Sequence, residues 1–103
     1  MPPVGDKQQY IAKLQKAVQQ AHRCEAAHRR SVAVHETARG KTLWKGTVEI
    51  FWLTGHPKAK RCYAWAKVGE NGTVESVETV LEIPPVIGAA TAVRTILSGR
   101  QEA

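Results

Sequence analysis

The chain has 103 residues and a formal net charge of +6, with 43% hydrophobic and 23% charged residues. This size and balance predict a single globular domain over residues 1–103 and exclude a disordered tail or a second independent core. The start of the sequence lacks the apolar run of a signal peptide or a membrane span, so we expect a cytoplasmic protein without membrane contact.

Positive charge is concentrated in the first two-thirds of the chain. Residues 1–67 contain thirteen Lys and Arg against four acidic residues, whereas residues 68–103 contain two against five. A domain polarised in this way favours a polyanion on its basic side or head-to-tail contact between copies. The alternative explanation is that the charge serves solubility alone.

A helix is the first predicted element. We expect residues 1–5 to be a flexible lead, and Asp6 with Gln9 three residues later forms a capping-box pattern that starts a helix. Apolar residues then recur at steps of three and four, and nothing interrupts this pattern before about Arg30. The prediction is therefore a helix over residues 7–30.

Alternating apolar and polar residues then predict four strands, followed by a second helix. The expected strands cover residues 31–37, 43–53, 59–68 and 73–83, with turns at 38–41, 55–58 and 70–72. Helical spacing predicts the last helix over residues 89–97, before a polar tail at 99–103. The expected fold class is α+β, in which a four-stranded antiparallel meander carries both helices on one face of the sheet.

The third strand has two different faces. One face carries the small residues that a strand needs beneath a closely packed helix, namely Cys62, Ala64 and Ala66. The other face brackets two aromatic residues with basic ones, in the order Arg61, Tyr63, Trp65, Lys67. We expect this second face to point away from the helices and to share an open surface with Lys45 and Phe51 of the preceding strand.

Three interpretations of this aromatic and basic face remain open. Aromatic residues interleaved with cations can stack bases and hold phosphates. The same residue types are enriched at homodimer interfaces. If the parity of the strand is reversed, the rings are core residues. We expect a non-enzymatic binding module that forms a homodimer, with nucleic acid as its external partner and a purely protein-interacting module as the alternative.

The loop between the second and third strands is strongly basic. The chain is expected to run helix, three strands, helix around this loop, in which Gly, His and Pro are followed by Ala-Lys-Arg and an aromatic residue. In this order it resembles double-stranded-RNA-binding domains over residues 47–98. The resemblance implies that the loop enters an RNA minor groove. It assigns the loop role to His56 and Pro57, and the flanking phosphate contacts to Lys58, Lys60 and Arg61.

No pattern of catalytic, cofactor or metal-binding residues stands out. Cys24 and His28 are four residues apart on the predicted helix, but the sequence has no CxxC pair to complete a zinc site. Cys24 and Cys62 are expected to be free thiols that pack as small core residues. A third candidate for the function of the protein is the binding of a small ligand in a pocket between helix and sheet, lined by Trp44, Trp52 and the first helix.

Overall fold

The computed structural model describes residues 4–68 and 74–98, which form two helices and one antiparallel sheet. The elements are α1 (Val4–His22), β1 (Glu25–Ala38), β2 (Lys41–Thr54), β3 (Arg61–Val68), β4 (Val74–Leu81) and α2 (Ala89–Leu97). The four strands lie in the order β1-β2-β3-β4, so the predicted helix, meander and helix of an α+β fold are confirmed. The expected turn at 70–72 and the expected tail at 99–103 lie outside the described residues.

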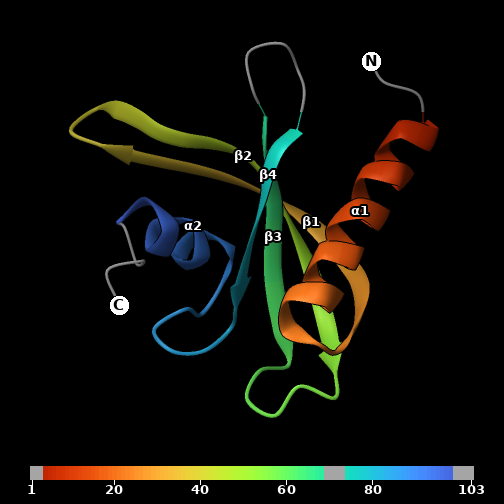
Figure 1. Cartoon of the computed structure of the whole chain (residues 1–103). Helices are drawn as coiled ribbons and strands as arrows, with labels where there is room; N and C mark the ends of the chain where they lie inside the picture. Colours follow the sequence, from red (N-terminus) through yellow and green to blue (C-terminus); the bar gives the residue numbers. More distant parts are fainter. Residues whose placement is uncertain (1–3, 69–73, 99–103) are drawn as a thin grey trace.

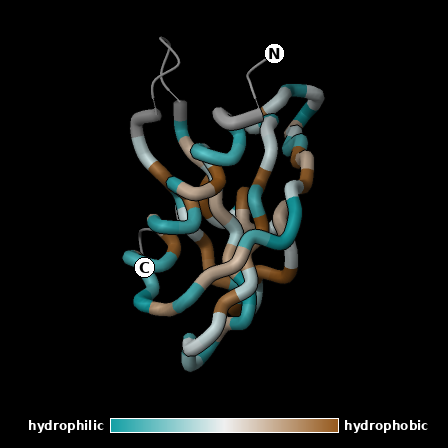
Figure 2. Tube along the Cα trace, turned by 90° about the vertical axis from the view of Figure 1, so that its right-hand side faces the viewer, coloured by the Kyte–Doolittle hydropathy of each residue, from teal (hydrophilic) through white to brown (hydrophobic). Residues whose placement is uncertain are grey.

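The two helices cover opposite faces of the sheet, as Figure 1 shows. On one face, Leu14 and Val18 of α1 pack in a cluster with Phe51 and Cys62. On the other face, residues 89–93 of α2 pack in a second cluster, which includes the rings of the third strand. The hydrophobic segments gather accordingly in the middle of the molecule (Figure 2). The expectation that both helices share one face is therefore wrong, because the sheet is apolar on both sides and each side needs its own cover.

Helix α1 begins earlier and ends earlier than its apolar pattern predicts. It starts at Val4 and stops at His22, where Arg23 adopts a positive φ of 54° and its N–H donates to the Gln19 carbonyl at 2.8 Å. The next residues continue as strand β1, since Ala26 is buried beneath α1 and pairs with β2. Tertiary packing thus overrides the helix propensity of this segment. Neither described helix combines the length and the apolar character needed to cross a bilayer.

Strands β1 and β2 form a hairpin of 14 residues per strand. Its turn is the one predicted from the sequence: Arg39 and Gly40 both have positive φ, at 54° and 78°, as a two-residue type I′ turn requires. Only the last part of β2, from Glu49 to Trp52, pairs with β3. The rest of the hairpin continues past β3 as an arm beside α2, shown in Figure 1.

A β-bulge interrupts the pairing of β1 with β2. His28 pairs with Phe51 and Arg30 pairs with Ile50, so that Arg29 is the extra residue between them. In a regular strand, consecutive side chains point to opposite faces. The bulge changes this alternation and re-aims the side chains next to it.

Candidate functional site

The aromatic residues expected on an open face are buried instead. Tyr63 and Trp65 are 3% and 4% exposed and lie under α2, whereas Phe51 is 0% exposed and lies under α1 on the opposite face. The prediction of an open aromatic face is therefore wrong. The alternation of β3 was assigned correctly, but the helix that covers its aromatic face could not be identified from a local pattern.

The predicted basic residues are exposed but do not form one surface. Lys45 lies in the hairpin arm, opposite His35, and Lys67 lies near the other end of β3, about 20 Å from Arg61 along the strand. Lys58 and Lys60 belong to the loop before β3. Of this predicted set, Lys60, Arg61 and His56 line a hollow that contains an exposed aromatic side chain.

His56 shapes its own loop. Its Nδ1 accepts hydrogen bonds from the backbone N–H groups of Lys58 and Ala59, both at 3.0 Å. On the other side, the ring of His22 lies 6.3 Å away in an edge arrangement. Burial, followed by the nearby His56, lowers the pKa of His22 below its usual value. His56 is therefore a residue that fixes the loop conformation, rather than a free group at its tip.

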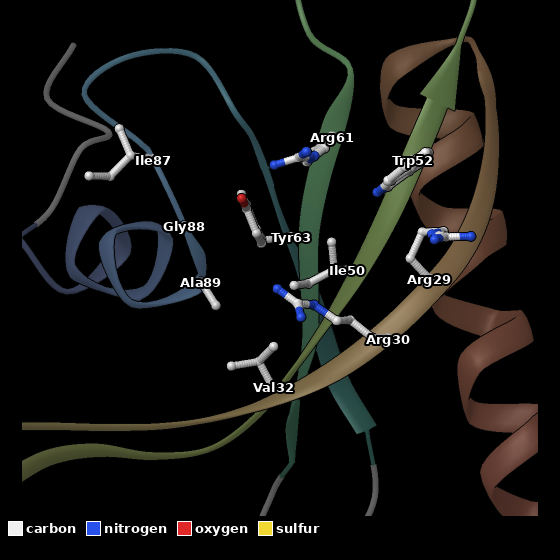
Figure 3. A pocket seen from close by; sticks show the side chains of 10 residues that line it. All are labelled: Arg29, Arg30, Val32, Ile50, Trp52, Arg61, Tyr63, Ile87, Gly88 and Ala89. Atoms are coloured by element: carbon white, nitrogen blue, oxygen red, sulfur yellow. The ribbon is translucent and has the colours of Figure 1, made fainter.

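A cavity of about 380 Å³ lies between the sheet and the start of α2. Side chains of three strands and of the segment before α2 line it, as Figure 3 shows. They are Arg29, Arg30 and Val32 of β1, Ile50 and Trp52 of β2, Arg61 and Tyr63 of β3, and then Ile87, Gly88 and Ala89. Trp52 lines this cavity, but the cavity is not the pocket expected from the sequence, because α2 forms its wall and neither Trp44 nor the first helix contributes to its lining.

Trp52 is the most exposed aromatic side chain at this cavity. It is 47% exposed, although Val48 and Ile50, which precede it on the same face of β2, are buried. The guanidinium carbon of Arg29 lies 4.2 Å from the centroid of the Trp52 ring, and that of Arg61 lies 5.8 Å away. A guanidinium stacked on an aromatic ring keeps its N–H edge free for oxygen acceptors. The sequence contained no signal for this arrangement, because Arg29 reaches the ring through the bulge.

The arginines of the cavity differ in how they are neutralised. Arg61 lies 3.7 Å from Oε2 of Glu82, an ion pair at the rim. The Tyr63 hydroxyl donates to the same oxygen at 2.5 Å. Burial and then the bond to Glu82 raise the pKa of Tyr63 to about 12. Within residues 4–68 and 74–98, no carboxylate forms an ion pair with Arg29 or Arg30.

A second hollow, of about 470 Å³, lies on the loop side of Trp52. It shares Trp52 and Arg61 with the cavity described above. Lys60 adds a second cationic side chain to its lining, and the loop contributes Gly55 and His56. Trp52 therefore separates two adjoining depressions, each with positive charge in its wall.

The buried carboxylate of Glu49 is the centre of a separate polar cluster on the α1 face. It is 2% exposed, and its Oε1 accepts hydrogen bonds from His28 at 2.8 Å and from the Ser31 hydroxyl at 2.5 Å. Ser31 and His28 thus both form hydrogen bonds with the carboxylate and not with each other. The two hydrogen bonds satisfy this buried carboxylate and link β1 to β2 through side chains.

The thiols and potential metal ligands do not form a site among the described residues. Cys24 is partly buried and Cys62 is fully buried, and both are free thiols. Cys24 and His28 lie in or next to β1 and not on a helix, so the spacing considered for a metal site does not apply. No group of three potential ligands occurs in the part of the chain that the structure describes.

Comparison with known proteins identifies no relative of this chain: no protein-family model, no curated protein sequence and no solved structure matches it. The resemblance to double-stranded-RNA-binding domains is limited, since the first turn of α2 carries no basic residue that could contact phosphates. The cationic and aromatic cavity must therefore be interpreted from its own chemistry.

Proposed function

We propose that this protein is a non-enzymatic module that binds single-stranded nucleic acid at the surface around Trp52. The observation that carries the proposal is the half-exposed Trp52 ring with Arg29 and Arg61 beside it, between two hollows with cationic walls. We call this region the Trp52 surface and define it by Arg29, Arg30, Trp52, Lys60 and Arg61.

Stacking supports a single-stranded partner. An isolated exposed hydrophobic residue is common on protein surfaces and needs no explanation by itself. A tryptophan with guanidinium groups stacked against it differs, because unpaired bases stack on both aromatic rings and guanidinium planes. Bases inside a duplex are not available for such contact. Trp52 thus favours single strands over the duplex RNA that the sequence resemblance implied.

Charge supports an anionic partner. The surplus of positive charge is carried by residues 1–67, and Arg29 and Arg30 have no ion-pair partner among the described residues. In contrast, Arg94 donates to Glu36 at 2.7 Å and is therefore already neutralised. Arg29 and Arg30 are consecutive in β1 and both line the cavity, so the phosphates of a strand can approach two guanidinium groups at one place.

Fluorescence anisotropy with a short labelled oligothymidylate tests this proposal. We expect binding that weakens steeply from low to near-physiological salt, because each neutralised phosphate releases counterions. Trp52→Ala should weaken binding by about 1–3 kcal/mol through lost stacking. Leu43→Ala, which removes another exposed hydrophobic side chain from the distant hairpin arm, is the matched control and should bind as the wild type does.

A DNA duplex provides the second arm of this test. If Trp52 stacks on bases, Trp52→Ala should reduce the affinity for the single strand and leave the weaker affinity for the duplex nearly unchanged. Equal losses on both partners would assign the effect to charge or shape and contradict the stacking. Absence of binding at low salt would overturn the proposal, since a basic protein binds nucleic acid best under that condition.

Self-association is a second candidate property, which we propose on a different surface from the one the sequence suggested. β1 and β4 are the two edge strands of the sheet, and β1, with 14 residues, offers the longer edge for pairing with another copy. Light scattering at micromolar concentration should then give about twice the 11.3 kDa of one chain. A mass of one chain would reject it without affecting the Trp52 surface.

A further inference from the structure

We propose that the cavity between the sheet and the start of α2 receives a terminal nucleotide, with its base on the apolar floor and its phosphate monoester at the arginines. This inference rests on the proposed function, because it places in the cavity the terminal nucleotide of a strand that lies across the Trp52 surface. The same chemistry is present in a free mononucleotide, and the experiment below separates the two sources.

The cavity combines an apolar floor with a cationic rim. Val32, Ile50 and the ring of Tyr63 come from three adjacent strands and form the floor (Figure 3). Arg30 and Arg61 extend over this floor, and Arg29 lies beside Trp52 at the edge (Figure 3). A ligand that fits both parts has a flat, weakly polar body and an anionic group at one end. A nucleotide has this composition, and at about 380 Å³ the cavity is near the small end of ligand-pocket volumes.

The cavity adjoins a further hollow on each side. On the side away from Trp52, residues 87–89 form its wall, and together with Val32 they also line a further hollow beside the hairpin arm. On the other side, the lining continues across Trp52 and Arg61 into the second hollow. A strand on the Trp52 surface can therefore reach the cavity across Trp52, and the charge at the rim decides between a terminal and an internal nucleotide.

The charge at the rim matches a monoester better than a phosphodiester. A terminal phosphate carries about −1.5 to −2 charges at neutral pH and has three acceptor oxygens, whereas an internal phosphate carries a single charge. Guanidinium groups bind such oxygens through their paired N–H donors. Three arginines line one cavity here, and Arg29 and Arg30 form no ion pair with any described carboxylate.

Two further features bear on the anion. The N-terminus of α2 lies at the cavity through Gly88 and Ala89, and the positive end of a helix dipole adds to the attraction of the arginines. Against this, Glu82 lies 3.7 Å from Arg61 and competes with an incoming phosphate for that guanidinium. Removal of this competing charge should therefore strengthen binding.

Isothermal titration calorimetry with unlabelled strands of one sequence tests the inference. The strands carry a 5′-phosphate, a 3′-phosphate or hydroxyl groups at both ends, and thymidine monophosphate and thymidine are titrated separately. We expect one phosphorylated strand to bind about tenfold more tightly than the hydroxyl-ended strand, as the added charge-assisted hydrogen bonds warrant. The monophosphate should bind and thymidine should not.

Variants localise the effect. Arg30→Gln should abolish the preference for the phosphorylated end and keep most of the affinity for the hydroxyl-ended strand. Lys13→Gln, which removes an equal charge from the exposed surface of α1, should keep the preference. Glu82→Gln should increase the affinity for the phosphorylated strand by up to about fivefold, which is the range of exposed ion pairs.

The outcomes separate the inference from the proposed function. Strands that bind equally with and without a terminal phosphate overturn the inference and leave the proposed function standing. Binding of the monophosphate alone, lost in Arg30→Gln, supports the cavity as a nucleotide site and overturns the proposed function. If no strand and no nucleotide binds, both fail. If inorganic phosphate binds as tightly as the monophosphate, the role of the apolar floor is refuted.

Discussion

Trp65 and Trp52 provide a matched pair of substitutions that tests the assignment of buried and exposed faces. Both are tryptophans of adjacent, paired strands, and both lie on the face of the sheet that α2 partly covers. Trp65 is 4% exposed, whereas Trp52 is 47% exposed. The same change, tryptophan to alanine, should therefore have very different effects on folding stability at the two positions.

The magnitude for Trp65→Ala follows from its surroundings. Its ring packs in the cluster with α2 and meets the Trp44 ring edge-on at a centroid distance of 5.6 Å. Removal of a buried tryptophan costs about 3–5 kcal/mol of unfolding free energy. For a domain of this size, that loss corresponds to a fall in melting temperature of roughly 12 °C or more. It is a large fraction of the roughly 5–15 kcal/mol that stabilises a typical domain.

The loss for Trp52→Ala should be about 1 kcal/mol or less, since the contact with Arg29 is a partly exposed cation–π pair. Urea denaturation followed by circular dichroism measures both free energies on the same scale. Equal losses in the two variants, or a loss under about 1 kcal/mol for Trp65→Ala, would refute the assignment of the α2 face as core. The same measurement shows whether Trp52→Ala is folded and thus suitable for the binding assay.

Two further predictions concern titratable groups. Burial raises the pKa of Cys62 to about 12, so a maleimide should label Cys24 first and reach Cys62 only on unfolding; rapid double labelling of the native protein would contradict this. Burial and the bond to Glu82 raise the pKa of Tyr63 from 10.0 to about 12. Because the raised pKa belongs to the folded state, the stability contributed by the neutral phenol is full below pH 10.0 and decreases as the pH rises toward 12. Tyr63→Phe should remove this part of the pH dependence in urea denaturation, and an unchanged pH profile would show that Tyr63 titrates normally.

Local sequence patterns were sufficient for the kind and order of the elements. A period of two predicts strands and a period near 3.6 predicts helices, and both periods are visible within a few residues. The turn at Arg39 and Gly40 could be predicted for a similar reason, because a glycine accepts the positive φ that a tight hairpin requires. The end of α1 was missed, since residues 25–30 have the composition of a helix but are held in β1 by pairing with β2.

The candidate site depends on contacts between distant parts of the chain. Alternation divides β3 into two faces, but both faces are apolar enough to be buried, so nothing local says which helix covers which face. Helix α2 lies over Tyr63 and Trp65 and buries them. It does not extend over Trp52, so that ring remains exposed.

The sequence by itself determined an α+β domain with a basic first two-thirds and placed Lys60 and Arg61 in a basic segment. Only the tertiary structure decided that Arg29, Arg30 and Trp52 act on one cavity. Regular alternation would send Arg29 and Arg30 to opposite faces, whereas the bulge in β1 brings both to the cavity. The reason is physical: periodicity is set by the backbone of one segment, but burial and the meeting of charges are set by how segments far apart in the chain pack together.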